Sequence, residues 1–161
     1  MTSQVRSLDH FTVPDPAASD PRPGPAAPRV LVVEDQALLA LALVADLAAM
    51  GCMIVGRAAS GEQATDLARR EAPDIVLMDV RLAGAIDGIE AAARIQRASS
   101  ARIVFITAFS EGADRARMDA LGPAGVIGKP YDPDALAKVM GACTVWLQAQ
   151  RRGPATAGSA D

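Results

Sequence analysis

Aromatic residues, cysteine and histidine are all scarce in this chain: aromatics make up 3% of its 161 residues, and there are two cysteines and one histidine. Cys52 and Cys143 form no CxxC pair and no other metal-ligand spacing. This excludes a disulfide framework and offers nothing for a structural zinc site. We expect both cysteines to be small buried apolar residues of a protein in a reducing compartment.

Blocks of basic residues and long apolar runs are also missing. The formal net charge is -3, so the electrostatic footprint of a nucleic-acid-binding protein is absent. The longest strongly apolar stretch, Ala37–Met50, is shorter than the ~20 residues that cross a bilayer, and Asp46 interrupts it. The first residues contain no apolar signal core. We therefore expect a cytoplasmic protein that binds neither nucleic acid nor a membrane.

The overall composition is that of one globular domain. Half of the residues are hydrophobic and 22% are charged. Six of the 11 prolines fall in the first 28 residues, where no hydrophobic period is sustained. We expect residues 1–28 to be a disordered proline-rich arm, residues 29–150 to fold, and residues 151–161 to be a flexible tail.

Within the folded part, short apolar runs alternate with longer helical patterns. The predicted strands are Arg29–Val33, Cys52–Gly56, Asp74–Met78, Arg102–Thr107 and Gly125–Gly128. The predicted helices are Gln36–Met50, Ser60–Glu71, Gly88–Ala98, Glu111–Leu121 and a last one from the Asp132-Pro133 cap to Gln150. Strict alternation requires right-handed crossovers and a parallel sheet covered on both faces. The sequence therefore predicts an α/β protein with a doubly wound five-stranded parallel sheet and five helices.

Polar residues follow the predicted strands. They are Glu34, Asp35, Asp79, Thr107 and Lys129. Each alone has a plain structural explanation, as a helix cap or a solvated charge. Together they gather at one edge of the sheet, because the ligand crevice of an open parallel sheet lies outside the carboxyl ends of its strands.

Converging carboxylates point to a metal and to phosphate chemistry. Three carboxylates repel one another unless a cation is present, and oxygen-only ligands favour Mg²⁺ with phosphate oxygens. A carboxylate can attack phosphorus to form an aspartyl phosphate, while a metal and an ammonium neutralise the transferring group. Asp79 stands alone at the central strand end, so we expect it to be the nucleophile, whereas the adjacent Glu34 and Asp35 suit a metal.

Four ordered motifs resemble the receiver domain of bacterial two-component response regulators. They are V-V-E-D at 32–35, L-M-D at 77–79, T-A at 107–108 and K-P at 129–130. The resemblance covers residues 29–150 and implies a flavodoxin-like fold with strand order 2-1-3-4-5. It also implies that Asp79 accepts a phosphoryl group from the phosphohistidine of a sensor histidine kinase or phosphotransfer protein.

The same resemblance implies a role for each remaining polar residue. Mg²⁺ is held by Glu34, Asp35, Asp79 and the backbone carbonyl of Arg81. Lys129 binds a phosphoryl oxygen, and Thr107 is the switch that moves toward the phosphoryl group. The bond between Lys129 and Pro130 is expected to be cis.

The chain departs from the family pattern at several positions. Ala83 stands where a proline is usual, and the segment from Asp79 to Gly88 is one residue longer than the common form. Val126 replaces the aromatic residue whose rotation reports phosphorylation in many members. We expect Tyr131 and Trp146 to pack rather than to form a relay or a binding anchor.

The leading hypothesis is a single-domain response regulator, whose phosphorylation shifts an equilibrium toward a surface that a downstream protein binds. A phosphorelay intermediate, a phosphate sink and a phosphorylation-independent scaffold stay open as alternatives. A flavin carrier is disfavoured because Glu34-Asp35 replaces a phosphate-binding loop, and an aspartyl phosphatase because Asp79 is not followed by the second Asp of a D-x-D motif. We thus expect a signalling domain, not an enzyme beyond its own phosphotransfer and dephosphorylation.

Overall fold

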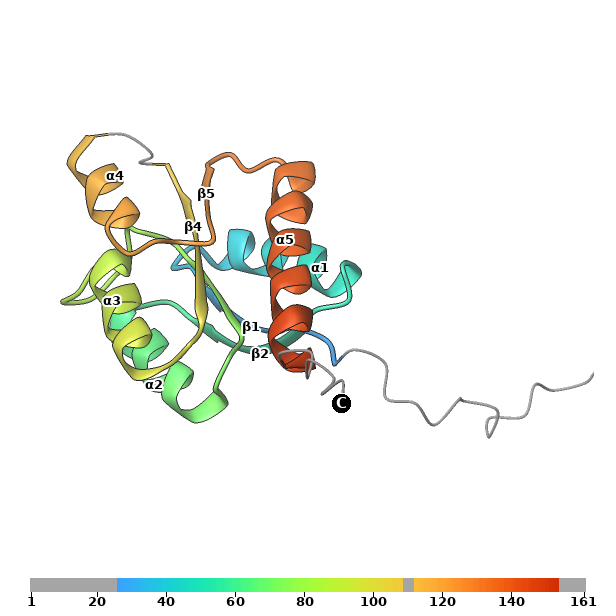
Figure 1. Cartoon of the computed structure of the whole chain (residues 1–161). Helices are drawn as coiled ribbons and strands as arrows, with labels where there is room; N and C mark the ends of the chain where they lie inside the picture. The colour runs from blue at the N-terminus through green and yellow to red at the C-terminus, as the bar shows by residue number, and fades with distance from the viewer. Residues whose placement is uncertain (1–25, 109–111, 154–161) are drawn as a thin grey trace, which may run out of the picture.

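A five-stranded parallel sheet with helices on both faces forms the described part of the chain, residues 26–108 and 112–153 of a computed structural model (Figure 1). The strands are β1 (Arg29–Val33), β2 (Met53–Ala58), β3 (Ile75–Met78), β4 (Arg102–Thr107) and β5 (Gly125–Gly128). The helices are α1 (Ala37–Ala49), α2 (Gly61–Glu71), α3 (Gly88–Ala98), α4 (Gly112–Asp119) and α5 (Pro133–Arg152). The strand order is β2-β1-β3-β4-β5 with every pair parallel, which confirms the predicted fold.

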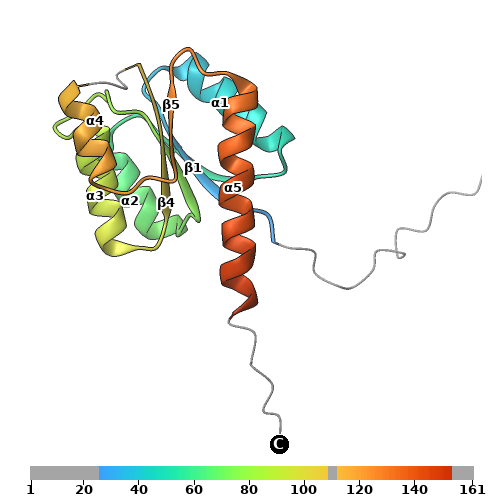
Figure 2. The same ribbon diagram turned by 45° about the horizontal axis from the view of Figure 1, so that its top comes forward.

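Strand alternation divides the core into two layers. Leu31 and Val33 of β1 point toward α2, α3 and α4, whereas Val30 and Val32 point toward α1 and α5. Figure 2 shows the sheet edge-on between these two groups of helices. All four residues are buried, as expected for a central strand of a parallel sheet.

Helix boundaries follow from capping side chains. Ser60 accepts a hydrogen bond from the Gln63 amide at 3.2 Å, as the predicted capping box requires. The Gln63 side chain itself accepts from the Ala59 amide rather than from that of Ser60. Asp132 caps α5 through the Asp134 amide, with proline at the first turn as predicted.

Several predicted boundaries need correction by one or two residues. Helix α1 lacks Gln36 and Met50, strand β3 lacks Asp74, and helix α4 ends at Asp119 rather than at Leu121. The second strand runs over Met53–Ala58 rather than Cys52–Gly56, because a register shift lets it pair with β1 as far as Val33. Helix α5 continues to Arg152, so the first two residues of the expected tail are helical. The Arg151 guanidinium bonds to the Asp74 carboxylate at 2.8 Å, which holds this last turn against the start of β3.

The chain is also ordered just before β1. Pro28, assigned to the arm by composition, is buried, and its carbonyl accepts a hydrogen bond from the Met53 amide at 2.8 Å. Most of the predicted arm, including His10, lies outside the described residues. Of the helices in residues 26–108 and 112–153, none is both long and apolar enough to span a membrane.

Candidate functional site

Three carboxylates meet at the carboxyl edge of the sheet. Glu34 and Asp35 follow β1, and Asp79 follows the neighbouring strand β3, where its amide donates to the Val33 carbonyl at 3.0 Å. One carboxylate oxygen from each acid lies within 4.8 Å of the others. Glu34 and Asp79 are buried and Asp35 is exposed. The sequence prediction that these acids converge is thus met by the geometry.

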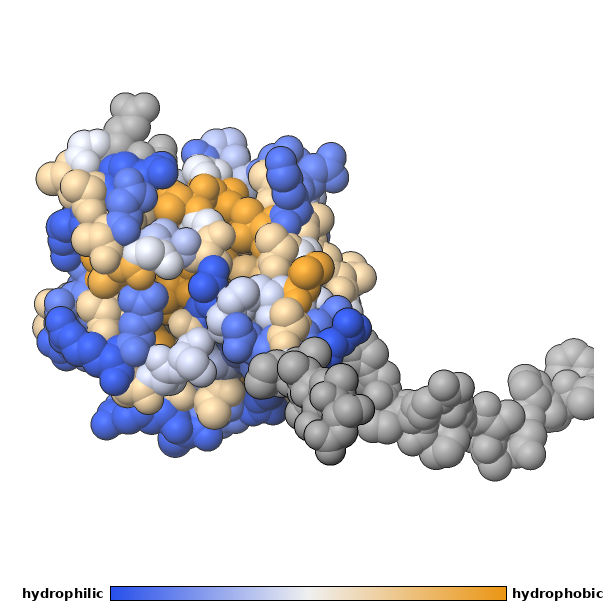
Figure 3. All heavy atoms as spheres, viewed as in Figure 1, coloured by the Kyte–Doolittle hydropathy of each residue, from blue (hydrophilic) through white to orange (hydrophobic). Residues whose placement is uncertain are grey.

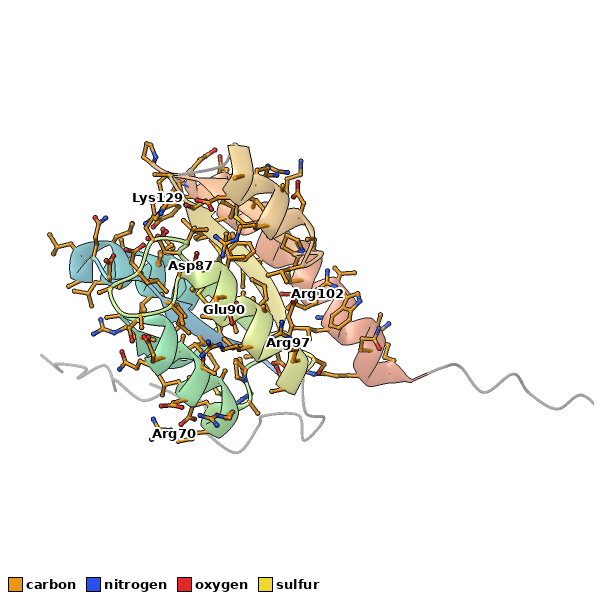
Figure 4. The ribbon with its side chains drawn as sticks, turned by 90° about the vertical axis from the view of Figure 1, so that its left-hand side faces the viewer. Arg70, Asp87, Glu90, Arg97, Arg102 and Lys129 are labelled. Carbon is orange, nitrogen blue, oxygen red and sulfur yellow. The ribbon has the colours of Figure 1, made fainter. Side chains whose placement is uncertain are left out.

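A lysine joins this cluster from two strands away. The Lys129 ammonium donates to Glu34 Oε2 and to Asp79 Oδ2, both at 2.6 Å. Its own amide donates to the Thr107 carbonyl at 2.9 Å, which ties the end of β5 to the end of β4. Figure 4 shows Lys129 at this end of the molecule, and the Lys129–Pro130 bond is cis, as the resemblance implied.

The charges of the cluster do not balance. Burial raises the pKa of the Glu34 carboxyl, and repulsion from Asp79 adds to this against the hydrogen bond from Lys129. Burial alone would lower the pKa of Lys129, but its hydrogen bonds to Asp79 and Glu34 outweigh that effect and raise it. One ammonium against three ionised carboxylates leaves two negative charges, which is the charge that one divalent cation would neutralise.

The donor set fits Mg²⁺. All three side chains offer carboxylate oxygens, the hard ligands that Mg²⁺ prefers, and the exposed Asp35 leaves one side open to water and phosphate. Glu34, Asp35 and Asp79 are therefore the residues that would hold the ion. The Arg81 carbonyl as a further ligand stays a prediction; the Arg81 amide donates to Asp79 Oδ1 at 3.3 Å, so this residue lies next to the central acid.

A glycine sets how closely the loop after β3 returns to the site. A Cβ at Gly88 would lie 1.7 Å from the Asp79 carbonyl oxygen, a distance no side chain can tolerate. The Gly88 amide donates to the Val80 carbonyl at 2.8 Å, and Asp87 caps α3 through the Glu90 amide at 2.8 Å. The start of α3 is therefore packed directly against the backbone of the central acid.

Glu62 holds the lengthened loop, a role that the sequence analysis missed. Its Oε1 accepts from the amides of Ala85 and Ile86 at 2.8 and 3.1 Å. Hydrogen bonds from backbone amides, its own first and then that of Ala85, lower the pKa of this carboxyl. Gly84 has φ +116°, and a Cβ there would meet Glu62 Oε2 at 2.5 Å. The one sequence signal for Glu62 is its place as an acidic residue in the first turn of α2. That signal alone indicates only a favourable interaction with the helix dipole.

The other singled-out residues lie as follows. Thr107 ends β4 and is fully buried beside the site. Val126 packs against the layer formed with α2, α3 and α4. Tyr131 donates from its hydroxyl to Asp46 Oδ2 at 2.7 Å; burial and this hydrogen bond raise the pKa of the phenol to about 12. Tyr131 and Trp146 both pack against the layer with α1 and α5, as expected.

Arg81, two residues after Asp79, is bonded to α4. The Arg81 side chain bonds to Asp114 Oδ2 at 2.9 Å. Arg117, one turn further along α4, bonds to Asp87 at 2.8 Å. These two ion pairs connect the β3–α3 loop to the helix that follows β4.

Comparison with known proteins identifies the family of this chain. Residues 30–140 match the model of the response regulator receiver domain. The chain is 43% identical over 105 residues to the transcriptional regulatory protein PdtaR of Mycobacterium tuberculosis, covering 64% of this chain and 50% of that protein. It is 38% identical over 103 residues to the response regulator GacA of Pseudomonas viridiflava, covering 63% of this chain and 48% of that one. The chain thus spans about half the length of the curated relatives it matches.

Solved structures give the same match. The signal receiver domain of a modulated diguanylate cyclase from Desulfovibrio desulfuricans superimposes with a TM-score of 0.71 at 33% identity, covering 77% of this chain and 98% of that one. The response regulator PhyR from Brucella abortus superimposes with a TM-score of 0.65 at 27% identity, covering 78% of this chain and 51% of that one. Both similarities cover more than three quarters of this chain.

Proposed function

Since the chain belongs to the response regulator receiver domain family, we propose that Asp79 accepts a phosphoryl group from a phosphohistidine donor in a Mg²⁺-dependent reaction. One observation supports this above all. The Asp79 carboxylate is 5% exposed, is held by an ammonium at 2.6 Å, and lies within 4.8 Å of two further acids. Such an arrangement suits the transfer of a dianionic phosphoryl group to a carboxylate.

Each residue has a chemical task in this step. A carboxylate oxygen of Asp79 forms the new O–P bond while the P–N bond of the donor breaks, and the electron pair of that bond leaves with the imidazole nitrogen. Lys129 then exchanges a carboxylate partner for a phosphoryl oxygen, so its charge stays compensated. Bound Mg²⁺, held by Glu34, Asp35 and Asp79, would neutralise charge on the transferring group.

The response would travel through the end of β4. The Thr107 carbonyl accepts from the Lys129 amide, so a shift of Lys129 toward a phosphoryl group pulls on both strands. Figure 3 shows apolar surface over β4 and β5, between α4 and α5. With Val126 in place of an aromatic residue, we propose that the downstream protein reads the position of β4 and α4 on this face. Relay to another phosphotransfer protein and a phosphate sink use the same chemistry and are separated by identifying that partner.

The donor has a surface to dock on beside the site. A groove of about 700 Å³ lies next to Lys129 and is lined by Leu38, Leu39, Ala42 and Tyr131 among others. Leu38 is 84% exposed and Leu41 53%, although both are large apolar residues. Exposed apolar surface of this kind marks a protein contact, and its place beside Lys129 would bring the donor's phosphohistidine to Asp79.

The test is the intact mass after incubation with acetyl phosphate and Mg²⁺. We expect one added phosphoryl group on the native chain, none on Asp79→Asn, and none after the metal is chelated. Asp87→Asn is the matched control, because Asp87 is a nearby cap outside the acid cluster and its variant should be phosphorylated normally. Phosphorylation of Asp79→Asn to the native extent would refute the assignment.

A further inference from the structure

Arg102 is a cation without an acidic partner in residues 26–108 and 112–153. It begins β4, and alternation along the strand puts it on the same face as Val104 and Ile106, which are buried in the layer with α1 and α5. Its guanidinium carbon lies 4.7 Å from the centre of the Trp146 ring. Its Nε is buried and has no hydrogen-bond partner. A buried donor in this state is uncommon, because such atoms are nearly always satisfied.

The neighbouring acid is already engaged. The Asp74 carboxylate accepts from the Arg29 amide at 2.9 Å and from the Arg151 guanidinium at 2.8 Å. Arg151 therefore has its counter-charge, whereas the Arg102 side chain, within the described ranges, faces an aromatic ring and no acid. Figure 4 shows Arg102 away from the end of the molecule that carries Lys129.

Two cavities adjoin at this position. One of about 370 Å³ is lined by Pro73, Asp74, Leu147 and Arg151 among others. The second, of about 360 Å³, includes Arg102, Ile103 and Leu121 in its wall and contains no acidic residue. Ser99, Ser100, Ala101 and Trp146 line both cavities. Each has the size of a small-molecule site.

We propose that these adjoining cavities form a second binding site, which takes a small organic carboxylate with an apolar body. The guanidinium supplies a planar fork of donors that matches a carboxylate. Trp146, Ile103 and Leu121 supply apolar walls for the remainder of the molecule. A carboxylate is favoured over a free inorganic anion because the cavity walls next to Arg102 are mainly apolar, and a fully hydrated ion gains nothing from them.

The site is independent of the acid cluster. Arg102 begins β4 and Thr107 ends it, so about 16 Å of strand separates the two ends. Phosphoryl transfer and carboxylate binding should therefore fail separately when Asp79 or Arg102 is changed.

Trp146 gives a direct readout, because it is the chain's one tryptophan. Hexanoate is the probe, with hexanamide as its uncharged analogue and inorganic phosphate as a head group without a body. We expect hexanoate to change Trp146 fluorescence saturably, and to bind Arg102→Gln at least about tenfold more weakly. Arg97→Gln is the matched control: Arg97 is exposed near the end of α3 and lines neither cavity. Asp79→Asn should bind hexanoate as the native chain does.

A second variant, which fills the cavities, separates loss of binding from loss of folding. Ser100 is exposed and lines both cavities, so Ser100→Phe should fold normally by circular dichroism and lose hexanoate binding with Arg102 intact. Equal binding of hexanamide and hexanoate would overturn the role of the cation. Equal binding of inorganic phosphate would refute the need for an apolar body in the ligand. The absence of any saturable response to hexanoate would refute the site itself.

Discussion

At the carboxyl edge of the sheet Lys129 bonds to two carboxylates, whereas at the amino edge Arg102 has no acidic partner among the residues that the structure describes. Both cations sit near strand ends, and both are at least partly buried. At the first, acidic charge is in excess and a metal and a phosphoryl group fit. At the second, positive charge is left over and an anion fits. The same sheet thus carries excess negative charge at its carboxyl edge and excess positive charge at its amino edge.

The largest expected effect comes from removing the paired cation. Lys129→Met leaves Glu34 and Asp79 buried without their counter-charge, and such a loss costs about 3 kcal/mol. We expect the free energy of unfolding, measured by urea denaturation without divalent metal, to fall by that amount. Lys138→Met, an exposed change on α5, should have almost no effect. Equal stability of the Lys129 variant and the native chain would show that the cluster does not need the ammonium.

A backbone change at the same edge should come next. Gly88→Ala places a methyl group against the Asp79 carbonyl, and the required shift of the loop should cost about 2 kcal/mol and slow phosphorylation. Gly141→Ala is the matched control, since nothing lies within 4 Å of a Cβ there and alanine favours the helix. The two substitutions should have opposite signs in urea denaturation. A neutral Gly88→Ala would mean that the start of α3 is free to move.

Removing the unpaired cation should have the opposite sign to Lys129→Met. Arg102→Met deletes a buried donor that has no partner, which is worth more than the cation–π contact it gives up. We expect the free energy of unfolding to rise by up to about 1 kcal/mol. Arg97→Met serves as the control. Destabilisation as large as that of Lys129→Met would erase the contrast between the two edges.

The smallest effect is the pH dependence of an ion pair between α3 and α4. Burial would raise the pKa of Asp87, but hydrogen bonds from Arg117 and the Glu90 amide outweigh it and lower the pKa below 3.8. A carboxyl whose pKa is lower in the folded state stabilises fully above its unfolded value and loses that contribution as the pH falls below about 3.8. Because the pair is part-exposed, its contribution should stay under about 1 kcal/mol.

Asp87→Asn keeps a capping side chain and removes the charge. The native chain should exceed it in unfolding free energy at neutral pH, and the difference should shrink in urea titrations below pH 3.8. A difference that is the same at neutral pH and below pH 3.8 would show that the charge of Asp87 does not cause it.

The elements with local sequence signals are predictable from the sequence alone. Helix Gly88–Ala98 and strands Arg102–Thr107 and Gly125–Gly128 agree with the structure residue for residue, because β-branched runs and glycines mark their ends. The edge strand β2 was misplaced because its pairing with β1 sets its limits.

The acid cluster could also be predicted from the sequence, since parallel strands bring their carboxyl ends together. Glu62 bonds to the loop at Ala85, and Arg102 lies against the Trp146 ring. Both contacts join segments that are far apart in the sequence, so no local pattern predicts them. The excess positive charge at the amino edge could therefore be recognised only from the structure.

The most direct test of phosphorylation at Asp79 is to locate the phosphoryl group on the chain. Borohydride reduces an acyl phosphate on an aspartate to homoserine, which peptide mass spectrometry can place. After treatment with acetyl phosphate and Mg²⁺, we expect homoserine at Asp79, in the native chain and in Arg102→Gln alike. Homoserine at Asp35, or its appearance in Asp79→Asn, would contradict this assignment.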